Sequence, residues 1–301
     1  MSKIGVVVVT YNRLDKLNKA LLAYEEQSYK ASVIVVVNNA STDGTKEYLG
    51  KWMIDNRATT KKVVLDLPSN IGGSGGFYEG QKEILKYDVD WVMIADDDAY
   101  PQSDYLKGMN EFIEKNSNNK YSVVCGKVLQ NGKYCHRGRW HNKWSINYQQ
   151  DVPQSMYKNT IFKIDFVSYV GIVINVDKLR QAGLVKKEYF IWVDDHEHSI
   201  RLNKIGDMVC LSNYTIVHDT ENQGSVISWK DYYGRRNAID MFKTHFFLNY
   251  IFVLLIEFTK LLLYPLKGYN SKIMKMRYQA VYDGIMGNLG INKKYRPGWK
   301  V

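Results

Sequence analysis

The sequence predicts an α/β protein built on a doubly wound, Rossmann-like sheet. Four runs rich in Val and Ile, at residues 4–10, 33–38, 62–66 and 91–95, alternate with segments of helical pattern. Alternating strands and helices form parallel sheets, because each helix carries the chain back to the start of the next strand. Ligands of such sheets bind beyond the carboxyl ends of the strands. The polar residues that follow these strands are therefore the first candidates for a site.

Each predicted element has its own local signal. Helical spacing of four leucines predicts a helix over roughly residues 13–28, and Ser41-Thr-Asp-Gly-Thr45 has the residue types of a turn and helix cap before a helix at about 44–54. The pattern is more mixed after residue 101, and it turns helical from about residue 229. Strand signals in this second part lie at residues 122–129, 161–167, 170–175 and 208–217.

The bulk composition is that of an ordered globular protein with a sizeable core. The chain has 301 residues, of which 45% are hydrophobic and 24% charged. Its three cysteines, Cys125, Cys135 and Cys210, are too widely spaced for a disulfide framework or a zinc site, which fits a reducing compartment. The N-terminus enters an apolar run at once and lacks the pattern of a signal peptide, so we expect a first strand there and a cytoplasmic protein.

The net charge of +10 is concentrated at the end of the chain. Residues 260–301 hold nine Lys and Arg side chains and a single acidic one, Asp283. Such a skew indicates an anionic partner, which could be nucleic acid, an acidic membrane surface or a phosphorylated lipid.

The most informative segment is Trp91-Val-Met-Ile-Ala-Asp-Asp-Asp-Ala-Tyr-Pro101. An apolar strand there ends in three consecutive carboxylates, which repel one another unless water or a cation neutralises them. Side chains alternate along an extended backbone, so Asp96 and Asp98 point the same way and Asp97 the other. Two such oxygen donors suit Mg²⁺ or Mn²⁺ holding a substrate diphosphate. The alternative is a solvated acidic loop.

A glycine-rich segment, Asn70-Ile-Gly-Gly-Ser-Gly-Gly76, precedes a predicted helix over Phe77–Tyr87. Glycine lets the backbone approach a ligand closely, and the N–H groups at a helix start favour phosphate. The segment is neither a Walker loop nor a dinucleotide fingerprint. A flexible turn is the alternative interpretation.

A second acidic cluster lies in Phe190-Ile-Trp-Val-Asp-Asp-His-Glu-His198. One carboxylate of a pair next to an acceptor hydroxyl can act as general base while the other sets its environment. A solvated helix start is the alternative. A second metal site with His196 and His198 is less favoured, because the spacing matches no zinc pattern. His218, at the end of a strand, is either structural or, if it lies near Asp98, a further metal ligand.

The apolar stretch at residues 245–264 is too short, in its uninterrupted part, to span a membrane. On a helical wheel His245, Asn249, Glu257 and Lys260 share one face and leave a broad apolar arc. Together with the basic tail, this arrangement predicts a helix that lies in a membrane interface. A helix packed on the protein's own core is the alternative.

Taken in order, five segments resemble the family 2 glycosyltransferases over roughly residues 3–237. They are VVVVTYNR, VVNNASTDGT, the triple Asp after a hydrophobic strand, WVDDHE and YYGRRN. The resemblance implies the GT-A fold, which has a mixed sheet, and inversion at the anomeric carbon. Two further segments, NIGGSGGF and IWVDDHEHSIR, are similar to galactofuranosyltransferases and their bacterial rhamnosyltransferase relatives.

The resemblance also implies roles for the matching residues. Those implied to bind the nucleotide-sugar donor are Thr10, Tyr11, Arg13, Asn39, Gly72, Gly73, Ser74, Gly75, Gly76, Asp96 and Asp97. Those implied to hold Mn²⁺ or Mg²⁺ are Asp96, Asp98 and His218. Asn39 stands where many relatives have Asp, which makes uracil binding less firmly implied. Asp195 would be the general base with Asp194 as the alternative, and Trp192 and His196 would contact the acceptor.

The implied domain organisation follows. Residues 1–235 would form the GT-A catalytic domain, with the nucleotide-sugar half in 1–100 and the acceptor half in 101–235, and residues 236–301 a helical, basic, membrane-associating extension. Loss of residues 245–301 is then expected to leave donor binding largely intact.

The implied function is transfer of galactofuranose from UDP-galactofuranose to a lipid-linked or polysaccharide acceptor in the synthesis of O-antigen, capsule or cell wall. Transfer from dTDP-rhamnose is the alternative donor chemistry. A module that binds nucleotide sugars or anionic polymers without catalysis is the alternative class, and the intact second carboxylate pair favours the enzyme. We expect attachment to the inner face of the plasma membrane and no nucleic-acid partner, and leave open an oligomer through the C-terminal helices.

Overall fold

The computed structural model describes residues 1–300 apart from 56–58, 117–118, 136–138, 143–148 and 221–226. The strands are β1 (Ile4–Thr10), β2 (Val33–Asn38), β3 (Lys61–Asp66), β4 (Trp91–Asp96), β5 (Ala99–Pro101), β6 (Tyr121–Gln130), β7 (Lys133–Tyr134), β8 (Arg139–Asn142), β9 (Gln149–Asp151), β10 (Ile161–Lys163), β11 (Phe166–Val167), β12 (Val170–Asn175) and β13 (Asp207–His218). The helices are α1 (Leu14–Glu25), α2 (Thr45–Ile54), α3 (Gly72–Ile84), α4 (Tyr105–Lys115), α5 (Val176–Ala182), α6 (Asp194–Asn203), α7 (Trp229–His245), α8 (Phe247–Leu266) and α9 (Ser271–Met286), with short 3-10 turns η2 (Gln154–Lys158) and η3 (Lys187–Tyr189).

The central sheet is mixed, as the GT-A resemblance implies. Its strand order among the described residues is β10-β13-β6-β12-β4-β1-β2-β3, with β5 paired to β13 and β7 to β6. Strands β4, β1, β2 and β3 run parallel, whereas β12 runs antiparallel to both β4 and β6. A small second sheet, β11-β8-β9, lies apart from it. The carboxyl ends of β1, β2 and β4 therefore share one edge, where the polar residues were expected to meet.

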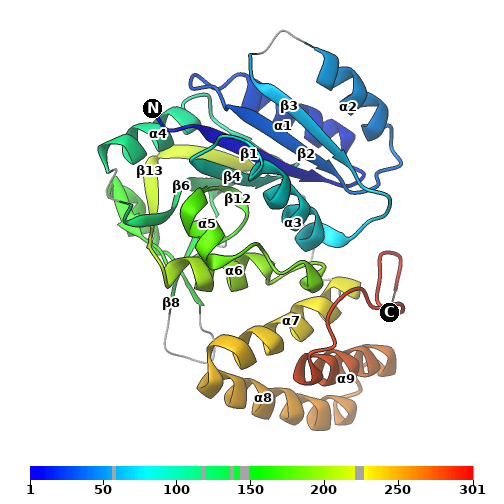
Figure 1. Cartoon of the computed structure of the whole chain (residues 1–301). Coiled ribbons are helices and arrows are strands. Elements are labelled where there is room, and N and C mark those ends of the chain that lie inside the picture. The colour runs from blue at the N-terminus through cyan, green and yellow to red at the C-terminus, as the bar shows by residue number, and fades with distance from the viewer. Residues whose placement is uncertain (56–58, 117–118, 136–138, 143–148, 221–226, 301) are drawn as a thin grey trace.

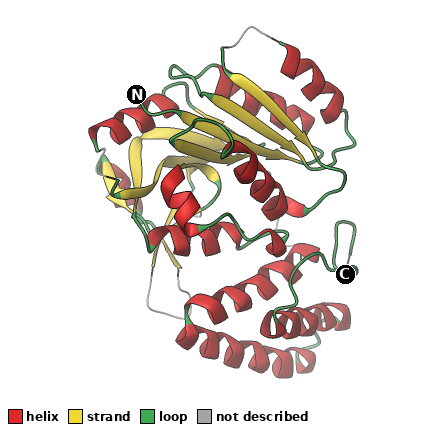
Figure 2. Cartoon of the chain, viewed as in Figure 1, coloured by secondary structure: helices red, strands yellow, loops and turns green. Residues whose placement is uncertain are grey.

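Helices cover both faces of the sheet, and each face buries its own apolar cluster (Figures 1 and 2). One cluster joins α1, α2 and α4 to the sheet, and the other joins α3, α5 and α6 to it. All seven residues of β1 are buried, because side chains on both faces of a central parallel strand meet helices. The Val- and Ile-rich composition of these strands follows from that burial.

The predicted elements are confirmed, apart from small shifts at their ends and three larger differences. The strand signal at 161–167 divides into β10 and β11, and the first helix ends at Glu25. The predicted helix over 77–87 begins earlier, at Gly72, so the glycine-rich segment is its first turn and not a preceding loop. Glycine disfavours a helix in isolation, but here it lets α3 pack closely on β1. A Cβ at Gly76 would lie 2.5 Å from Val9 Cγ1.

The three C-terminal helices form a separate layer below the sheet (Figure 1). Helix α7 packs against α8 and α9, and it also contacts α6, which packs on the sheet. The expected boundary between residues 235 and 236 falls inside α7, which is continuous from Trp229 to His245. The expected boundary therefore divides a single helix instead of falling between two elements.

Candidate active site

The acidic triplet sits where β4 ends, and its three carboxylates face different partners. Asp97 accepts hydrogen bonds from Thr10 Oγ1 at 2.8 Å and from Arg13 Nη1 at 3.2 Å. The same Arg13 nitrogen donates to Asp98 Oδ2 at 2.8 Å. Asp97 and Asp98 are almost fully buried, so the guanidinium offsets part of their charge. The alternative interpretation of the triplet, a solvated acidic loop, is therefore wrong.

Asp96, Asp98 and His218 form one cluster, with a ligand atom of each within 4.8 Å of the others. The cluster depends on strand pairing, because β5 pairs with β13 and sets His218 opposite Ala99. One further backbone bond, from Asp219 N to Asp98 O at 2.8 Å, fixes the same register. Asp98 Oδ1 is buried and accepts no hydrogen bond from the described part of the chain, although His218 Nε2 lies 3.3 Å away. A buried carboxylate oxygen left in this state fits a hard divalent cation.

Electrostatics in this cluster are uneven. Burial, reinforced by the neighbouring Asp98 and Asp97, raises the pKa of Asp96 well above its ordinary value. Burial opposes ionisation of Asp98 too, but His218 and Arg13 outweigh it and lower the pKa of that carboxyl. Nearby positive charge therefore outweighs the effect of burial on the pKa of Asp98 but not on that of all three carboxyls.

The glycine-rich start of α3 divides into two groups with different surroundings. Gly72 has a φ of +79°, and a Cβ there would lie 2.0 Å from the carbonyl oxygen of Phe190, to which Ser74 N donates at 3.1 Å. Gly72 and Gly73 line the cavity described below. Gly75 and Gly76 pack against Ile71 and Val9, and among the described residues they line neither cavity of the site. Their expected donor contact is not supported by the geometry.

Both polar atoms of the Asn39 side chain form hydrogen bonds with the protein's own backbone. Its Nδ2 donates to Gly72 O at 2.9 Å, and its Oδ1 accepts from Ile71 N at 2.9 Å. Both polar ends of the amide are thus used to hold the start of α3 beside β2. Asn39 still lines the cavity, together with Thr10 and the 38% exposed Tyr11. The structure therefore gives Asn39 a positioning role that the resemblance did not imply.

Asp194 and Asp195 open helix α6, where the positive end of the helix dipole favours negative charge. Burial, and for Asp194 also the charge of its neighbour, raises the pKa of each carboxyl to about 7. The residues leading into the helix are strained, because Phe190, Trp192 and Val193 all have positive φ, between 64° and 71°. Left-handed backbone at non-glycine residues is uncommon and concentrates at functional sites.

Helix α7 holds this strained turn in place through the YYGRRN segment, whose role sequence reasoning missed. Asn237 Nδ2 donates to the carbonyl oxygens of Tyr189, Ile191 and Trp192, at 2.9, 3.0 and 2.9 Å. Buried Arg236 donates to Tyr189 O at 3.2 Å as well. The only sequence signal for these contacts was the family resemblance of the segment itself.

The two histidines of the second acidic cluster have different surroundings. His196 packs edge-on to Trp140, with ring centroids 4.8 Å apart, and burial lowers its pKa to about 4, so it is neutral near pH 7. His198 is fully buried and bonded to Tyr169 Oη and to Gly183 O. Among the described residues, the group of side chains that could hold a metal ion includes neither His196 nor His198.

Two adjoining cavities gather these residues. The larger, about 580 Å³, is lined by both acidic clusters: Arg13, Asp96, Asp98, His218, Asp194 and Asp195, together with Ser74, Trp140, Tyr169, Trp192, His196 and Gly234. The smaller, about 240 Å³, is lined by Thr10, Tyr11, Asn39, Asn70, Gly72, Asp97, Phe190, Trp229, Lys230 and Pro297. Both include Arg13, Gly73, Asp96 and Ile191, so they meet beside Asp96. Trp229, Lys230 and Pro297 were not predicted.

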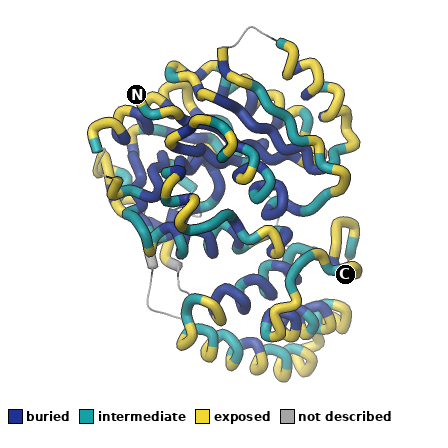
Figure 3. Tube along the Cα trace, viewed as in Figure 1, coloured by how far each residue is buried: buried dark blue, intermediate teal, exposed yellow. Residues whose placement is uncertain are grey.

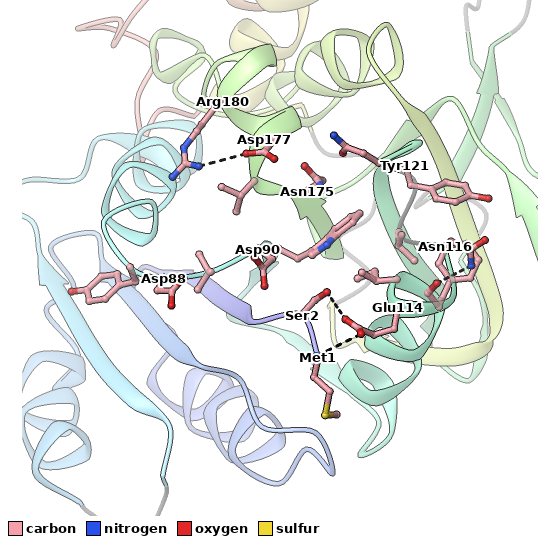
Figure 4. A pocket seen from close by; sticks show the side chains of 18 residues that line it. Met1, Ser2, Asp88, Asp90, Glu114, Asn116, Tyr121, Asn175, Asp177 and Arg180 are labelled. Atoms are coloured by element: carbon pink, nitrogen blue, oxygen red, sulfur yellow. Dashed lines mark hydrogen bonds and ion pairs between the residues drawn. The ribbon is translucent and has the colours of Figure 1, made fainter.

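A further cavity of about 670 Å³ lies at the opposite edge of the sheet, around the N-terminus (Figure 4). Its lining includes Asp88, Asp90 and Glu114, of which Glu114 pairs with Ser2 and the terminal amine. Neither acidic cluster of the site contributes to it. The predicted chemistry is therefore confined to the carboxyl edge.

The mixed sheet, with its cavities at the carboxyl edge, has the architecture of the GT-A fold. Residues 5–171, just over half of the chain, match the family model described as "Glycosyl transferase family 2". The chain belongs to this family.

Curated relatives align over a limited part of the chain. The galactofuranosyltransferase GlfT1 of Mycobacterium tuberculosis (strain H37Rv) is 36% identical over 98 residues, which are 32% of this chain and 30% of that protein. GlfT1 of Mycolicibacterium smegmatis is 32% identical over 95 residues, with the same shares. The match thus spans under a third of each relative's length.

Solved structures share the fold over most of the chain. GalNAc-T7 with UDP, GalNAc and Mn²⁺ superposes with a TM-score of 0.64 at 12% identity, over 81% of this chain and 48% of that one. S. aureus TarS 1–349 in complex with UDP-GlcNAc gives a TM-score of 0.63 at 19% identity, over 94% and 81%. At these identities the likeness supports the fold alone.

Proposed function

We propose that this glycosyltransferase moves galactofuranose from UDP-galactofuranose to a lipid-linked or polysaccharide acceptor in cell-surface glycan synthesis. The observation that supports transfer chemistry most directly is the larger cavity, in which both carboxylate clusters line one space. A donor diphosphate beside Asp96 and Asp98 would then have the Asp194–Asp195 pair on the wall of the same cavity. The choice of galactofuranose rests on NIGGSGGF and IWVDDHEHSIR and on the names of the curated relatives.

Asp195 is assigned as the general base, with Asp194 as the alternative. A base is most effective with a pKa near the working pH, and burial raises the pKa of Asp195 to about 7. The side chain of Asp195 is 22% exposed, which leaves it open to an acceptor hydroxyl. Trp192, 45% exposed on the same cavity, offers a flat face for a sugar ring. Proton removal by Asp195 during a single displacement inverts the anomeric carbon without an enzyme nucleophile.

Asp96, Asp98 and His218 are the residues that would hold Mn²⁺ or Mg²⁺. Oxygen and imidazole donors suit Mn²⁺, and the structural feature that fits a cation is the buried Asp98 Oδ1, which lies beside His218 and accepts no hydrogen bond from the described residues. Bound there, the ion would neutralise charge on the departing nucleoside diphosphate. Arg13 supports the same site from the other side, through its bonds to Asp97 and Asp98.

Calorimetry with a panel of UDP- and dTDP-sugars in Mn²⁺, followed by an assay of donor hydrolysis without acceptor, tests the donor assignment. We expect UDP-galactofuranose to bind most tightly and to release UDP slowly. Tighter binding and turnover of dTDP-rhamnose would make the alternative donor correct. Binding without any turnover, with or without acceptor lipids, would contradict the enzyme and favour the binding module without catalysis.

We also propose attachment to the inner face of the plasma membrane through α8. By length and composition this helix is long and apolar enough to cross a membrane, contrary to the sequence expectation, and very little of it is buried. Figure 3 colours almost all of α8, the lowest helix in the view, as exposed or intermediate. Its exposed residues include large apolar side chains. They are Phe247, Leu248, Ile251, Phe252, Leu255, Phe258, Leu262, Leu263 and Leu266.

The polar stripe of α8 faces inward, and this orientation favours a helix lying in the interface over a spanning one. Glu257, midway along α8, is buried and pairs with Arg235 of α7 and with Arg277 Nη2 of α9 at 2.6 Å. If α8 spanned the membrane, these two arginines and their helices would have to enter the hydrocarbon core, which is unfavourable in free energy. Exposed apolar surface of this extent marks a membrane or protein interface. The basic tail favours an anionic membrane.

A further inference from the structure

The chain returns to the active site after its last helix. Helix α9 ends at Met286, and Gly287 turns the backbone with a φ of +72°. Residues 287–300, here called the C-terminal strap, then run back towards the carboxyl edge of the sheet (red in Figure 1). The strap was expected to belong to a membrane-associating extension, but its position is that of a wall of the catalytic part.

Hydrogen bonds fix the first half of the strap to the loop before α6 and to α7. Gly290 N donates to Glu188 O at 2.7 Å, and Arg236 Nη1 donates to Gly290 O at 2.6 Å. Asn292 Nδ2 donates to Tyr232 Oη, and Asn292 N donates to the hydroxyl of Tyr233, both at 3.0 Å. The side chain of Asn292 also accepts from the backbone N–H of residues 294 and 295, which shapes the next turn.

Aromatic packing fixes the second half. The ring of Tyr295, 2% exposed, stacks on Tyr232 with centroids 4.8 Å apart, and Trp299 meets Tyr295 edge-on at 5.5 Å. These rings share one apolar cluster with Phe190, whose carbonyl oxygen accepts from Ser74 N at the start of α3. The strap is thereby packed into the same unit that positions the glycine-rich turn.

This anchoring places Pro297 at the mouth of the smaller cavity. Pro297 is exposed, and it lines that cavity together with Tyr11, Asn39 and Trp229. Among described residues, neither His218 nor the Asp194–Asp195 pair lines this space. A donor that lies across both cavities, with its diphosphate beside Asp96, would therefore have its nucleoside in the smaller one.

We propose that the C-terminal strap is the outer wall of the nucleoside end of the donor cavity, with Pro297 in contact with the nucleoside of a bound nucleoside diphosphate. This inference rests on the proposed function. Proline loses little conformational freedom on binding, and the anchors hold it in place beforehand, so the contact is preorganised. Donor binding then depends on the C-terminal strap as well, unlike the expectation that loss of residues 245–301 leaves it largely intact.

Substitutions in the full-length chain test the strap, with UDP and inorganic pyrophosphate as probes in Mn²⁺ calorimetry. Pro297→Glu puts a negative charge at the mouth of the cavity. Ile291→Glu makes the same charge change on the same strap at a 54% exposed residue that lines neither cavity of the site. Tyr295→Ala loosens the strap without adding charge, and its melting temperature reports whether the rest of the chain stays folded.

We expect Pro297→Glu to weaken UDP binding by roughly fivefold or more, through like-charge repulsion and lost contact, while Ile291→Glu binds UDP like the parent chain. Tyr295→Ala should weaken UDP binding but leave pyrophosphate binding unchanged, because only UDP has a nucleoside. Equal UDP binding by the parent chain, Pro297→Glu and Tyr295→Ala would overturn the strap assignment alone. A parent chain that binds neither UDP nor pyrophosphate would overturn the proposed function as well.

Discussion

At the scale of single residues, Asp195 combines ionisation near neutral pH with access to the acceptor side of the cavity. Asp195→Asn keeps the shape of the side chain and removes its ability to take a proton. We expect sugar transfer to fall by roughly 10²-fold or more while UDP binding is unchanged. Asp177→Asn, the same change at an exposed acid of α5, is the matched control. A crippled Asp194→Asn with an active Asp195→Asn would exchange the two roles.

The same carboxyl predicts the pH dependence of the rate. Because the pKa of Asp195 is raised to about 7, the side chain is protonated and inactive as a base below that pH. The kcat/KM should therefore rise about tenfold per pH unit below neutrality and level off above it. A rate profile from pH 5 to 9 measures this limb. A limb centred near pH 4 would show that a carboxyl of ordinary pKa is the base.

Asp98 tests the cation site at the same scale. Asp98→Ala removes one of three clustered ligand atoms, and we expect loss of transfer together with weaker Mn²⁺ binding in a metal titration. Treatment of the unaltered chain with EDTA should abolish transfer, and added Mn²⁺ should restore it. Full activity in excess EDTA would rule out a metal-dependent reaction.

At the scale of elements, the turn before α6 is strained, and α7 supplies the bonds that maintain it. Asn237→Ala removes one donor group shared by three carbonyl oxygens. We expect a loss of about 1–3 kcal/mol in the free energy of unfolding, because the carbonyl oxygens of Ile191 and Trp192 lose this bond, whereas that of Tyr189 keeps its bond from Arg236. The kcat should fall roughly tenfold, since the carboxylates lose their fixed geometry, while the pH limb stays near neutrality.

Chemical denaturation and steady-state kinetics measure the two effects of Asn237→Ala separately. Asn203→Ala, which removes a side-chain bond to Asp165 at the far end of α6, is the comparison. If Asn237→Ala lowers stability but leaves kcat unchanged, the bonds from α7 do not position the catalytic carboxylates.

At the scale of the whole molecule, α8 presents its apolar side outward because Glu257, on its other side, forms ion pairs with arginines of α7 and α9. Leu255→Asp with Leu262→Asp, at side chains 58% and 74% exposed, should release the protein from phosphatidylglycerol vesicles in a sedimentation assay. Ile54→Asp makes the same kind of change on α2, at a 75% exposed residue. High salt should weaken binding of the unaltered chain, because exposed charges are screened.

Binding to vesicles that is unaffected by the double substitution would assign α8 another role. A concentration-dependent dimer that the same substitutions dissolve would show that α8 meets a second copy of the chain. These substitutions leave the C-terminal strap untouched, so UDP binding should be unchanged. Deletion of residues 245–301 is less informative, since it removes the strap together with α8.

The sequence by itself determined the sheet edge and the two acidic clusters. Buried strands such as β1 and β4 have mostly apolar sequences, so the strands and the polar residues that follow them can be predicted from the sequence. The family resemblance added the roles of matching residues, and the cluster of Asp96, Asp98 and His218 agrees with the implied ligand set. The sequence predicts these features because they depend on residues that are close together along the chain.

Tertiary structure decided what distant segments do together. Only the pairing of β5 with β13 brings His218 to Asp98, and only close packing on β1 turns the glycine-rich segment into the first turn of α3. Asn237 likewise hydrogen-bonds to the carbonyl oxygen of Trp192, 45 residues away along the chain. Pro297 lines a cavity that residues of β1 also line. A sequence records which side chains are available, but their partners depend on strand register and helix packing, which no local pattern specifies.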